Sequence, residues 1–230
     1  DSSVVTFEND FDPQSDPASE AADLATQCKE LLLRNSDVIN QSVPRSRRSH
    51  SPYNVASVHH DGMIDMASLL CGSEGTLAVF TEITLRTVPV ESAAVVLQVE
   101  FDSYAKMASA VPILVDSGAA ACELMDQSLM QLARNALPQY RELLPGEAKA
   151  CLWVEFAGSD EAGVTEAAEN AAEKVKSMAA RSELIVENSH RQQVAKARKD
   201  AVPLLYRRPG KRKAVAFVED VSVDNTRLGE

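Results

Sequence analysis

Hydrophobic and polar residues alternate with two different periods along this chain, one typical of strands and one typical of helices. Both patterns are clearest after residue 93. Leu97, Val99 and Phe101 alternate with polar residues, which is typical of a half-buried strand. Residues 164–178 instead repeat their apolar positions at the spacing of an amphipathic helix. Strand and helix patterns then alternate, which predicts an α+β or α/β layer fold with a boundary between residues 90 and 93.

The same patterns locate the expected elements of this part of the chain. We expect strands at 97–101, 121–125, 152–156, 184–186 and 214–223, and helices at 104–111, 129–137, 164–178 and 192–205. Pro112 is expected to end or kink the first of these helices, because proline lacks the amide hydrogen and crowds the preceding turn. Trp153 alternates away from Leu152 and Val154, and we expect it to pack beneath the alanine-rich helix at 164–178.

The earlier part of the chain has a weaker pattern. We expect a short strand at 4–7, a helix from Pro17 to Arg34, a loop at 42–52, a turn at Asp61-Gly62 and a strand at 77–88. Asp16 is the expected N-cap of the helix, with Pro17 at its first position. The run at 77–88 is β-rich and almost continuously apolar, so we expect it to be buried.

Composition narrows the class of protein. Hydrophobic residues make up 45% and charged residues 25% of the 230 residues, as in ordinary soluble globular proteins. The net charge of -11 argues against a nucleic-acid partner or an anionic membrane surface. The apolar stretches are too short for a membrane span, and no signal-peptide pattern is expected.

The four cysteines indicate a reducing compartment. Cys28, Cys71, Cys122 and Cys151 are widely and irregularly spaced, and no CxxC pair is present. This spacing fits neither a zinc site nor an iron–sulfur cluster within the chain. We therefore expect buried free thiols and a cytoplasmic protein.

Two glycines bracket a serine and a glutamate immediately before the run at 77–88. Glycine adopts positive φ and lets the backbone approach a ligand, so its amides can donate to phosphate or ring oxygens. Ser73 and Thr76 add hydroxyl groups that can donate to the same oxygens. The segment matches neither GxGxxG nor a P-loop. From the residues alone, a tight turn leading into a strand and a nucleotide-cradling loop both remain open.

The wider context of this glycine segment resembles the FAD-linked oxidases. Residues 69–86 read LLCGSEGTLAVFTEITLR and carry the most specific part of the resemblance. Further motifs lie around it in the family's order: Pro52-Tyr53-Asn54, Cys122-Glu123-Leu124-Met125-Asp126 and Phe217-Val218-Glu219-Asp220-Val221-Ser222-Val223. That family includes D-lactate dehydrogenases, D-2-hydroxyglutarate dehydrogenases and the flavin subunit of glycolate oxidase.

The resemblance implies an α+β fold made of two domain portions. Residues 1–91 would be the C-terminal portion of a PCMH-type FAD-binding domain, and residues 92–230 the N-terminal portion of a ferredoxin-like α/β cap domain. The missing parts of the same parent chain, with the family's histidine-rich metal motif, would lie outside these residues. We therefore expect the 230 residues to be inactive alone, and to self-associate through exposed edges.

The resemblance also implies a function. The parent protein would be an FAD-dependent oxidoreductase that oxidises the CH–OH group of a small 2-hydroxy acid by hydride transfer to the flavin. The substrate would be of the D-lactate, glycolate or D-2-hydroxyglutarate class. The long insertion between Phe7 and Tyr53 resembles large bacterial members that are fused to an iron–sulfur region outside this chain. The alternative is a non-catalytic α+β binding or assembly domain.

Site residues follow from the same resemblance. The flavin would be lined, largely through backbone groups, by Gly72, Ser73, Glu74, Gly75, Thr76, Leu77 and Val79. Arg198 would hold the substrate carboxylate, which a planar guanidinium can bind with two parallel hydrogen bonds. The alternative for Arg198 is a solvated helix arginine. No catalytic base is identified, and His59-His60-Asp61 offers too few ligands for a metal site.

Overall fold

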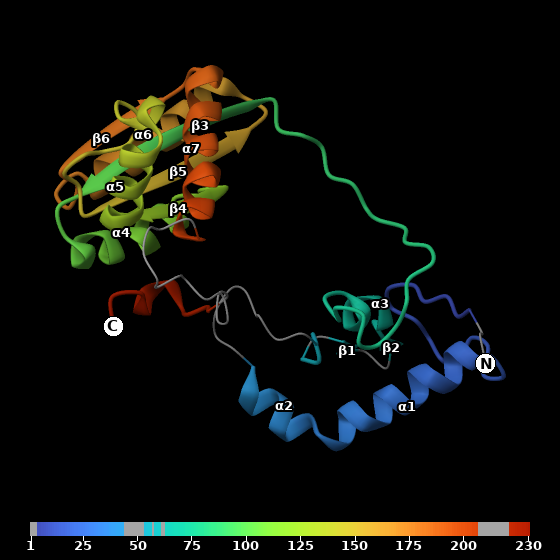
Figure 1. The fold of residues 1–230 in the computed structure, drawn as a ribbon. Helices are drawn as coiled ribbons and strands as arrows, with labels where there is room; N and C mark the ends of the chain where they lie inside the picture. The colour runs from blue at the N-terminus through green and yellow to red at the C-terminus, as the bar shows by residue number, and fades with distance from the viewer. Residues whose placement is uncertain (1–3, 44–52, 57, 61–62, 207–220) are drawn as a thin grey trace. The chain divides into compact units, whose positions relative to one another are not determined.

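The computed structural model describes residues 4–43, 53–56, 58–60, 63–206 and 221–230. The chain divides into two compact units, Asp1–Arg86 with Asp220–Ser222 and Thr87–Glu219 with Val223–Glu230. Figure 1 labels the elements of both units. The assignment of residues 1–91 and 92–230 to portions of an FAD-binding domain and a cap domain stays a prediction.

The second unit is built on a four-stranded antiparallel sheet in the order β4-β5-β3-β6. Its strands are β3 (Ala93–Phe101), β4 (Ala121–Asp126), β5 (Ala150–Gly158) and β6 (Arg181–Ile185). Helix α4 (Tyr104–Asp116) connects β3 to β4, and α6 (Glu161–Val175) connects β5 to β6. This order of strands and crossover helices is the ferredoxin-like βαββαβ arrangement, and it confirms the expected α+β class.

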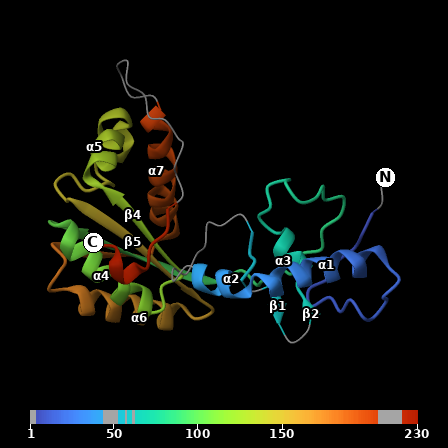
Figure 2. The same cartoon turned by 90° about the horizontal axis from the view of Figure 1, so that it is seen from below.

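Helices cover both faces of this sheet, as Figure 2 shows for α4 and α6 on one side and α5 and α7 on the other. Helix α5 (Gln127–Ala136) lies between β4 and β5 and is followed by the 3-10 turn η1 (Pro138–Tyr140), while α7 (Asn188–Tyr206) follows β6. The odd-numbered residues of β3 contact α4 and α6, and Val96 faces α5 and α7. The strand expected to be half-buried is therefore covered on both faces.

Aspartate side chains fix where α5 and α6 begin. Asp126 accepts a hydrogen bond from the amide of Leu129 at 2.7 Å and caps α5. Asp160 caps α6 by accepting from the amide of Gly163 at 2.9 Å. A Cβ at Gly163 would lie 2.8 Å from Oδ2 of Asp160, so a larger residue there would make the capping carboxylate shift.

Pro112 does not end α4, which continues to Asp116. The expectation of an early end is wrong for a physical reason. Ala110 and Leu114, on either side of the proline, are both fully buried in the core beneath α4. Their burial outweighs the hydrogen bond that proline cannot donate.

Trp153 packs on the opposite face from the one expected. It belongs to the core beneath α5 and α7, whereas Leu152 and Val154 face the alanine-rich helix α6. Neighbouring residues on a strand point to opposite faces of the sheet, so Trp153 must face away from α6 when Leu152 and Val154 face it. The indole Nε1 donates to Oε1 of buried Gln98 at 2.8 Å, which satisfies its polar atom.

The first unit has a smaller core. It contains α1 (Glu20–Arg34), α2 (Ser36–Ser42), β1 (His59–His60), β2 (Met63–Ile64) and α3 (Met66–Leu70). Its core cluster of buried residues consists of Ala25, Val58, Ile64, Met66 and Leu69. Helix α1 begins later than expected, because Ser19 rather than Asp16 is its N-cap and accepts from the amide of Ala22 at 3.2 Å.

Two expected strands are absent from the described part of the chain. Residues 4–7 form no regular element, although Phe7 makes an edge-to-face contact with Phe11 at 5.5 Å. Residues 77–88 are neither paired nor buried, and Val79 and Leu85 are 89% and 78% exposed. An extended apolar run becomes a buried strand only beside other strands, and the described residues provide none there.

Three other expectations fall wholly or mostly outside the described residues. These are the loop at 42–52, the turn at Asp61-Gly62 and the strand at 214–223. None of the helices within the described ranges has the length and apolar composition needed to cross a bilayer.

The four cysteines are free thiols in different surroundings. Cys151 is buried, Cys28 and Cys122 are half-buried, and Cys71 is exposed, so the expectation of buried thiols is wrong for Cys71. Burial, aided by the negative charge of Glu123, raises the pKa of Cys122 to about 11. Cys122 is therefore a protonated, unreactive thiol at neutral pH.

The Gln98–Trp153 hydrogen bond gives a testable contribution to stability. Gln98→Leu leaves the buried indole N–H without an acceptor, so we expect the free energy of unfolding to fall by about 1–3 kcal/mol. Urea unfolding followed by the fluorescence of the single tryptophan measures this change. A second measurement, by circular dichroism, compares Gln98→Leu in the wild-type and Trp153→Phe backgrounds. Equal losses in both backgrounds would contradict the role of the bond.

Candidate functional site

The glycine segment follows α3 directly and has an unusual backbone. Asp65 caps α3 by accepting from the amide of Ser68 at 2.8 Å, and the helix ends at Leu70. Gly72, Glu74 and Gly75 then have φ values of 79°, 51° and 75°. Such left-handed conformations suit glycine but are strained for glutamate, and strain of this kind is found preferentially at binding sites.

The chain itself uses only part of the hydrogen-bonding capacity of this loop. The amide of Ser73 donates to the carbonyl of Leu70 at 3.2 Å, and the amide of Thr76 donates to the carbonyl of Ser73 at 2.9 Å. The hydroxyl of Thr76 donates to the same carbonyl at 2.6 Å and lies 2.8 Å from the hydroxyl of Tyr53. Thr76 is thus engaged within the chain, although we expected it to face a ligand.

Other donors of the loop are unused within the described residues. There, the amides of Glu74 and Gly75 meet no acceptor, and the hydroxyl of Ser73 is buried without a hydrogen-bond partner. The space around Gly75 is also open, since a Cβ built there would meet nothing within 4 Å. An orphaned buried hydroxyl beside free amides fits a ligand that carries phosphate or ring carbonyl oxygens.

Arg198 lies on α7 and faces the edge strand β4. Its Nη1 is 2.7 Å from Oε1 of Glu123, and the two side chains are 32% and 48% exposed. The neighbouring residues Val194, Ala197 and Ala201 form the buried face of α7. Arg198 is therefore at the rim of the packed layer, where solvent and a soluble ligand can reach its guanidinium.

A second polar group fixes α7 close to Arg198. Asp200 accepts hydrogen bonds from the hydroxyl of Tyr140 and from Nζ of Lys196, the latter at 2.5 Å. The hydrogen bond from Lys196, followed by that from Tyr140, holds the pKa of Asp200 below its usual value. The hydrogen bond to Asp200 in turn raises the pKa of Tyr140. This arrangement links α7 to η1 without using Arg198.

Sequence reasoning missed the contact of Arg198 with Glu123 and the contact of Asp200 with Tyr140. The spacing of Lys196 and Asp200 on a helix is a local signal that could have indicated their ion pair. No local signal could have joined Arg198 to Glu123, because the two residues lie on elements that meet only in the folded sheet.

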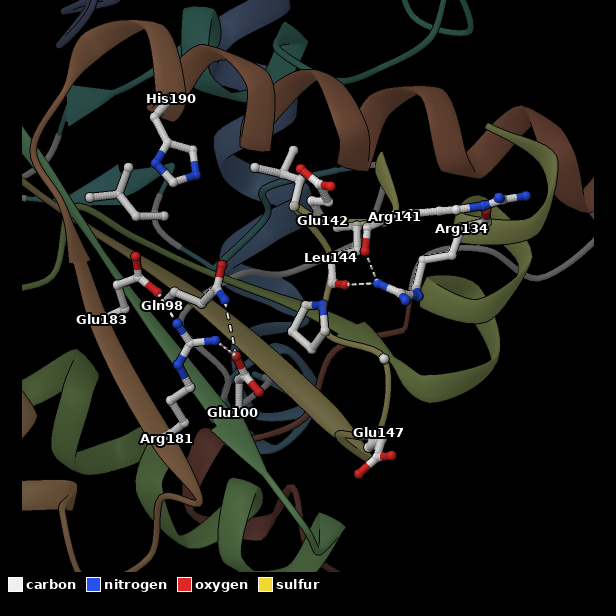
Figure 3. A pocket seen from close by; sticks show the side chains of 14 residues that line it. Gln98, Glu100, Arg134, Arg141, Glu142, Leu144, Glu147, Arg181, Glu183 and His190 are labelled. Atoms are coloured by element: carbon white, nitrogen blue, oxygen red, sulfur yellow. Dashed lines mark hydrogen bonds and ion pairs between the residues drawn. The ribbon is translucent and has the colours of Figure 1, made fainter. Parts of the chain in front are cut away.

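A pocket of about 460 Å³ opens between β3, β6 and the loop at 141–147, and Figure 3 shows the side chains that line it. Arg181 pairs there with Glu100 at 3.4 Å and with Glu183 at 2.5 Å. Arg134 donates to two main-chain carbonyl groups of the loop at 141–147. Arg181 is neutralised by these two carboxylates, whereas Arg134 is held by neutral carbonyl groups. Glu142 and Glu147 also line the pocket, so it carries no excess of positive charge for an anionic ligand.

Metal ligands do not gather in the described part of the chain, where no three His, Cys, Asp or Glu side chains come close enough to hold an ion. His59 lies in β1, and its Nε2 is buried without a hydrogen-bond partner among the described residues.

The second unit matches a known family. Residues 90–230 match the family described as "FAD linked oxidases, C-terminal domain". Since the match covers more than half of the chain, the chain belongs to the FAD-linked oxidases. The resemblance deduced from the glycine segment and its flanking motifs is therefore confirmed.

Two curated proteins are similar to this chain over most of its length. It is 26% identical over 220 residues to D-2-hydroxyglutarate dehydrogenase of Pantoea ananatis (strain AJ13355), an alignment that covers 89% of this chain and 21% of that protein. It is 28% identical over 216 residues to D-2-hydroxyglutarate dehydrogenase of Escherichia coli (strain K12), with 84% of this chain and 20% of that protein covered. The chain thus spans about a fifth of the length of these relatives.

The pKa of Asp200 gives a testable pH dependence. Because the folded-state pKa is lowered, Asp200 stabilises the fold above its unfolded pKa, and this contribution disappears as the pH falls through the folded-state value. We expect the stability difference between wild type and Asp200→Asn to be constant at neutral pH and to shrink below about pH 4. Urea unfolding at a series of pH values measures it.

Asp116→Asn, which removes the same charge from an exposed position on α4, shows the effect of net charge alone. If the difference between wild type and Asp200→Asn grew as the pH fell, the stabilising role of the Asp200 carboxylate would be disproved.

Proposed function

We propose that these residues belong to an FAD-dependent oxidoreductase that oxidises the CH–OH group of a small 2-hydroxy acid. Membership of the FAD-linked oxidases supports the cofactor, and the names of the two relatives make D-2-hydroxyglutarate the first substrate to test. The observation that carries the proposal is the buried, unpartnered hydroxyl of Ser73 beside free loop amides. When bound, FAD supplies the hydride acceptor.

The residues that would hold FAD form one continuous segment. They are Gly72, Ser73, Glu74, Gly75, Thr76, Leu77 and Val79. The amides of Glu74 and Gly75 and the hydroxyl of Ser73 would donate to the cofactor, while exposed Leu77 and Val79 would contact its apolar surface. An open loop also argues against a non-catalytic domain, in which side chains of the chain itself would fill this space.

Arg198 would hold the substrate carboxylate. Its guanidinium is accessible at the rim of α7, and its five N–H groups can bind a carboxylate with two parallel hydrogen bonds. A hydroxy acid bound in this way would be held at its carboxylate end, which would fix its orientation. The catalytic base would have to come from residues outside this chain.

The exposed run at 77–90 supports a proposal about partners. Val79, Leu85 and Val90 are 89%, 78% and 94% exposed, which is unusual for apolar residues of a globular protein. Further parts of the same parent chain would cover this segment by adding strands beside it. Without them, residues 1–230 would self-associate. The parent protein would also carry a fused iron–sulfur region outside these residues, and it would be located in the cytoplasm.

The role of the loop is tested by comparing two glycines that have the same strain. Gly75 and Gly118 have φ values of 75° and 89°, and a Cβ at either position meets nothing within 4 Å. Alanine at either site therefore costs about 1 kcal/mol of backbone strain. We expect only Gly75→Ala to lower the FAD content, because its methyl group enters space needed by the cofactor.

The measurement is the visible flavin absorbance per protein, taken on the protein produced from its complete reading frame. Gly118→Ala is the matched control, since Gly118 lies between α4 and β4. Equal FAD content in the two variants would refute the assignment of the loop.

The role of Arg198 is tested by steady-state kinetics on the same protein. We expect Arg198→Gln to raise KM for D-2-hydroxyglutarate roughly 10- to 100-fold, because a charged hydrogen bond to the carboxylate is lost. Lys199→Gln removes an exposed positive charge from the next position of α7 and serves as the control. If both variants changed KM equally, Arg198 would act only through net charge.

A further inference from the structure

The ion pair between Arg198 and Glu123 places a carboxylate of the chain itself on the proposed substrate anchor. Nη1 of Arg198 lies 2.7 Å from Oε1 of Glu123, a distance typical of a charge-assisted hydrogen bond. We infer that Glu123 is a competing carboxylate that occupies Arg198 in the absence of substrate and is displaced when the hydroxy acid binds. This inference rests on the proposed role of Arg198.

Glu123 is positioned for this role by the sheet. It lies on β4, which is an edge strand, and its Cα is in register with that of Trp153 on β5. Trp153 faces α7, so Glu123 points from the same face of the sheet toward the helix that carries Arg198. A side chain at a sheet edge can swing into solvent without disturbing the core.

Two other charged residues on this part of α7, Lys196 and Asp200, are matched elsewhere. Lys196 pairs with Asp200 at 2.5 Å, and Asp200 also accepts from Tyr140. Among the residues that the structure describes, Glu123 is the one carboxylate within ion-pair distance of Arg198. An incoming carboxylate therefore competes with one side chain for the guanidinium and does not have to break a network of ion pairs.

The strength of the pair suits displacement. Both side chains are partly exposed, at 32% for Arg198 and 48% for Glu123, and pairs of this kind are weak. A ligand carboxylate that binds the guanidinium through two parallel hydrogen bonds gains more than the pair loses. Glu123 thus lowers the affinity of Arg198 for every carboxylate ligand by a small factor. A ligand with a second negative charge near Arg198 is also repelled by the Glu123 carboxylate, which lowers its affinity further.

The test compares wild type with variants at Glu123 and Arg198. It measures the equilibrium affinity of the FAD-loaded protein for glutarate, a dicarboxylate without the oxidisable hydroxyl group, through the perturbation of the flavin absorbance on binding. We expect Glu123→Gln to bind roughly two- to fivefold more tightly than wild type, since the competing charge is gone. Glu123→Asp keeps the charge on a shorter side chain, and its affinity should lie between these two. The uncharged dimethyl ester of the same acid should bind wild type and Glu123→Gln equally.

Arg198→Gln and the double variant Glu123→Gln/Arg198→Gln complete the cycle. Without Arg198, removing Glu123 should no longer tighten binding, a result that general loosening of the fold would not produce. Weaker or unchanged binding in Glu123→Gln would overturn the inference while leaving the role of Arg198 intact. If Arg198→Gln bound the acid as tightly as wild type, the proposed carboxylate anchor itself would be overturned.

Discussion

The central strand β3 pairs with β5 on one side and β6 on the other, and helices cover both of its faces. No position along it can therefore carry an unsatisfied polar group without a large cost in free energy. Gln98 is tolerated because Trp153, its register partner on β5, donates a hydrogen bond to it. The same register continues to Glu123 on β4, so the pairing of three strands determines which carboxylate faces α7.

Much of this unit could be predicted from its sequence because the signals are local. Alternation located β3 and β5, and helical spacing located α5 and α6, since each pattern depends on residues close together in the chain. The face that a residue occupies is less local. Trp153 was expected beneath the wrong helix because the alternation shows that two faces exist but not which helix covers each.

Expectations failed where the outcome depends on what lies beside a segment. The run at 77–88 has the composition of a buried strand, yet an extended chain is buried only when other strands cover it. The glycine loop could be found because its spacing lies within a few residues. The contact of Arg198 with Glu123 could not, because it requires the register of the sheet and the position of α7 together.

The inner face of α7 includes two small side chains, Ala197 and Ala201, which are fully buried against the sheet. An alanine side chain has no atoms beyond Cβ, so these two residues contribute little to fixing the helix along its own axis. The hydrogen bond from Tyr140 to Asp200 fixes the position of the helix along its axis, at a point less than one turn from Arg198. Tyr140 is itself buried in the core beneath α5 and α7, so its hydrogen bond couples the packing of that core to the position of the Arg198 guanidinium.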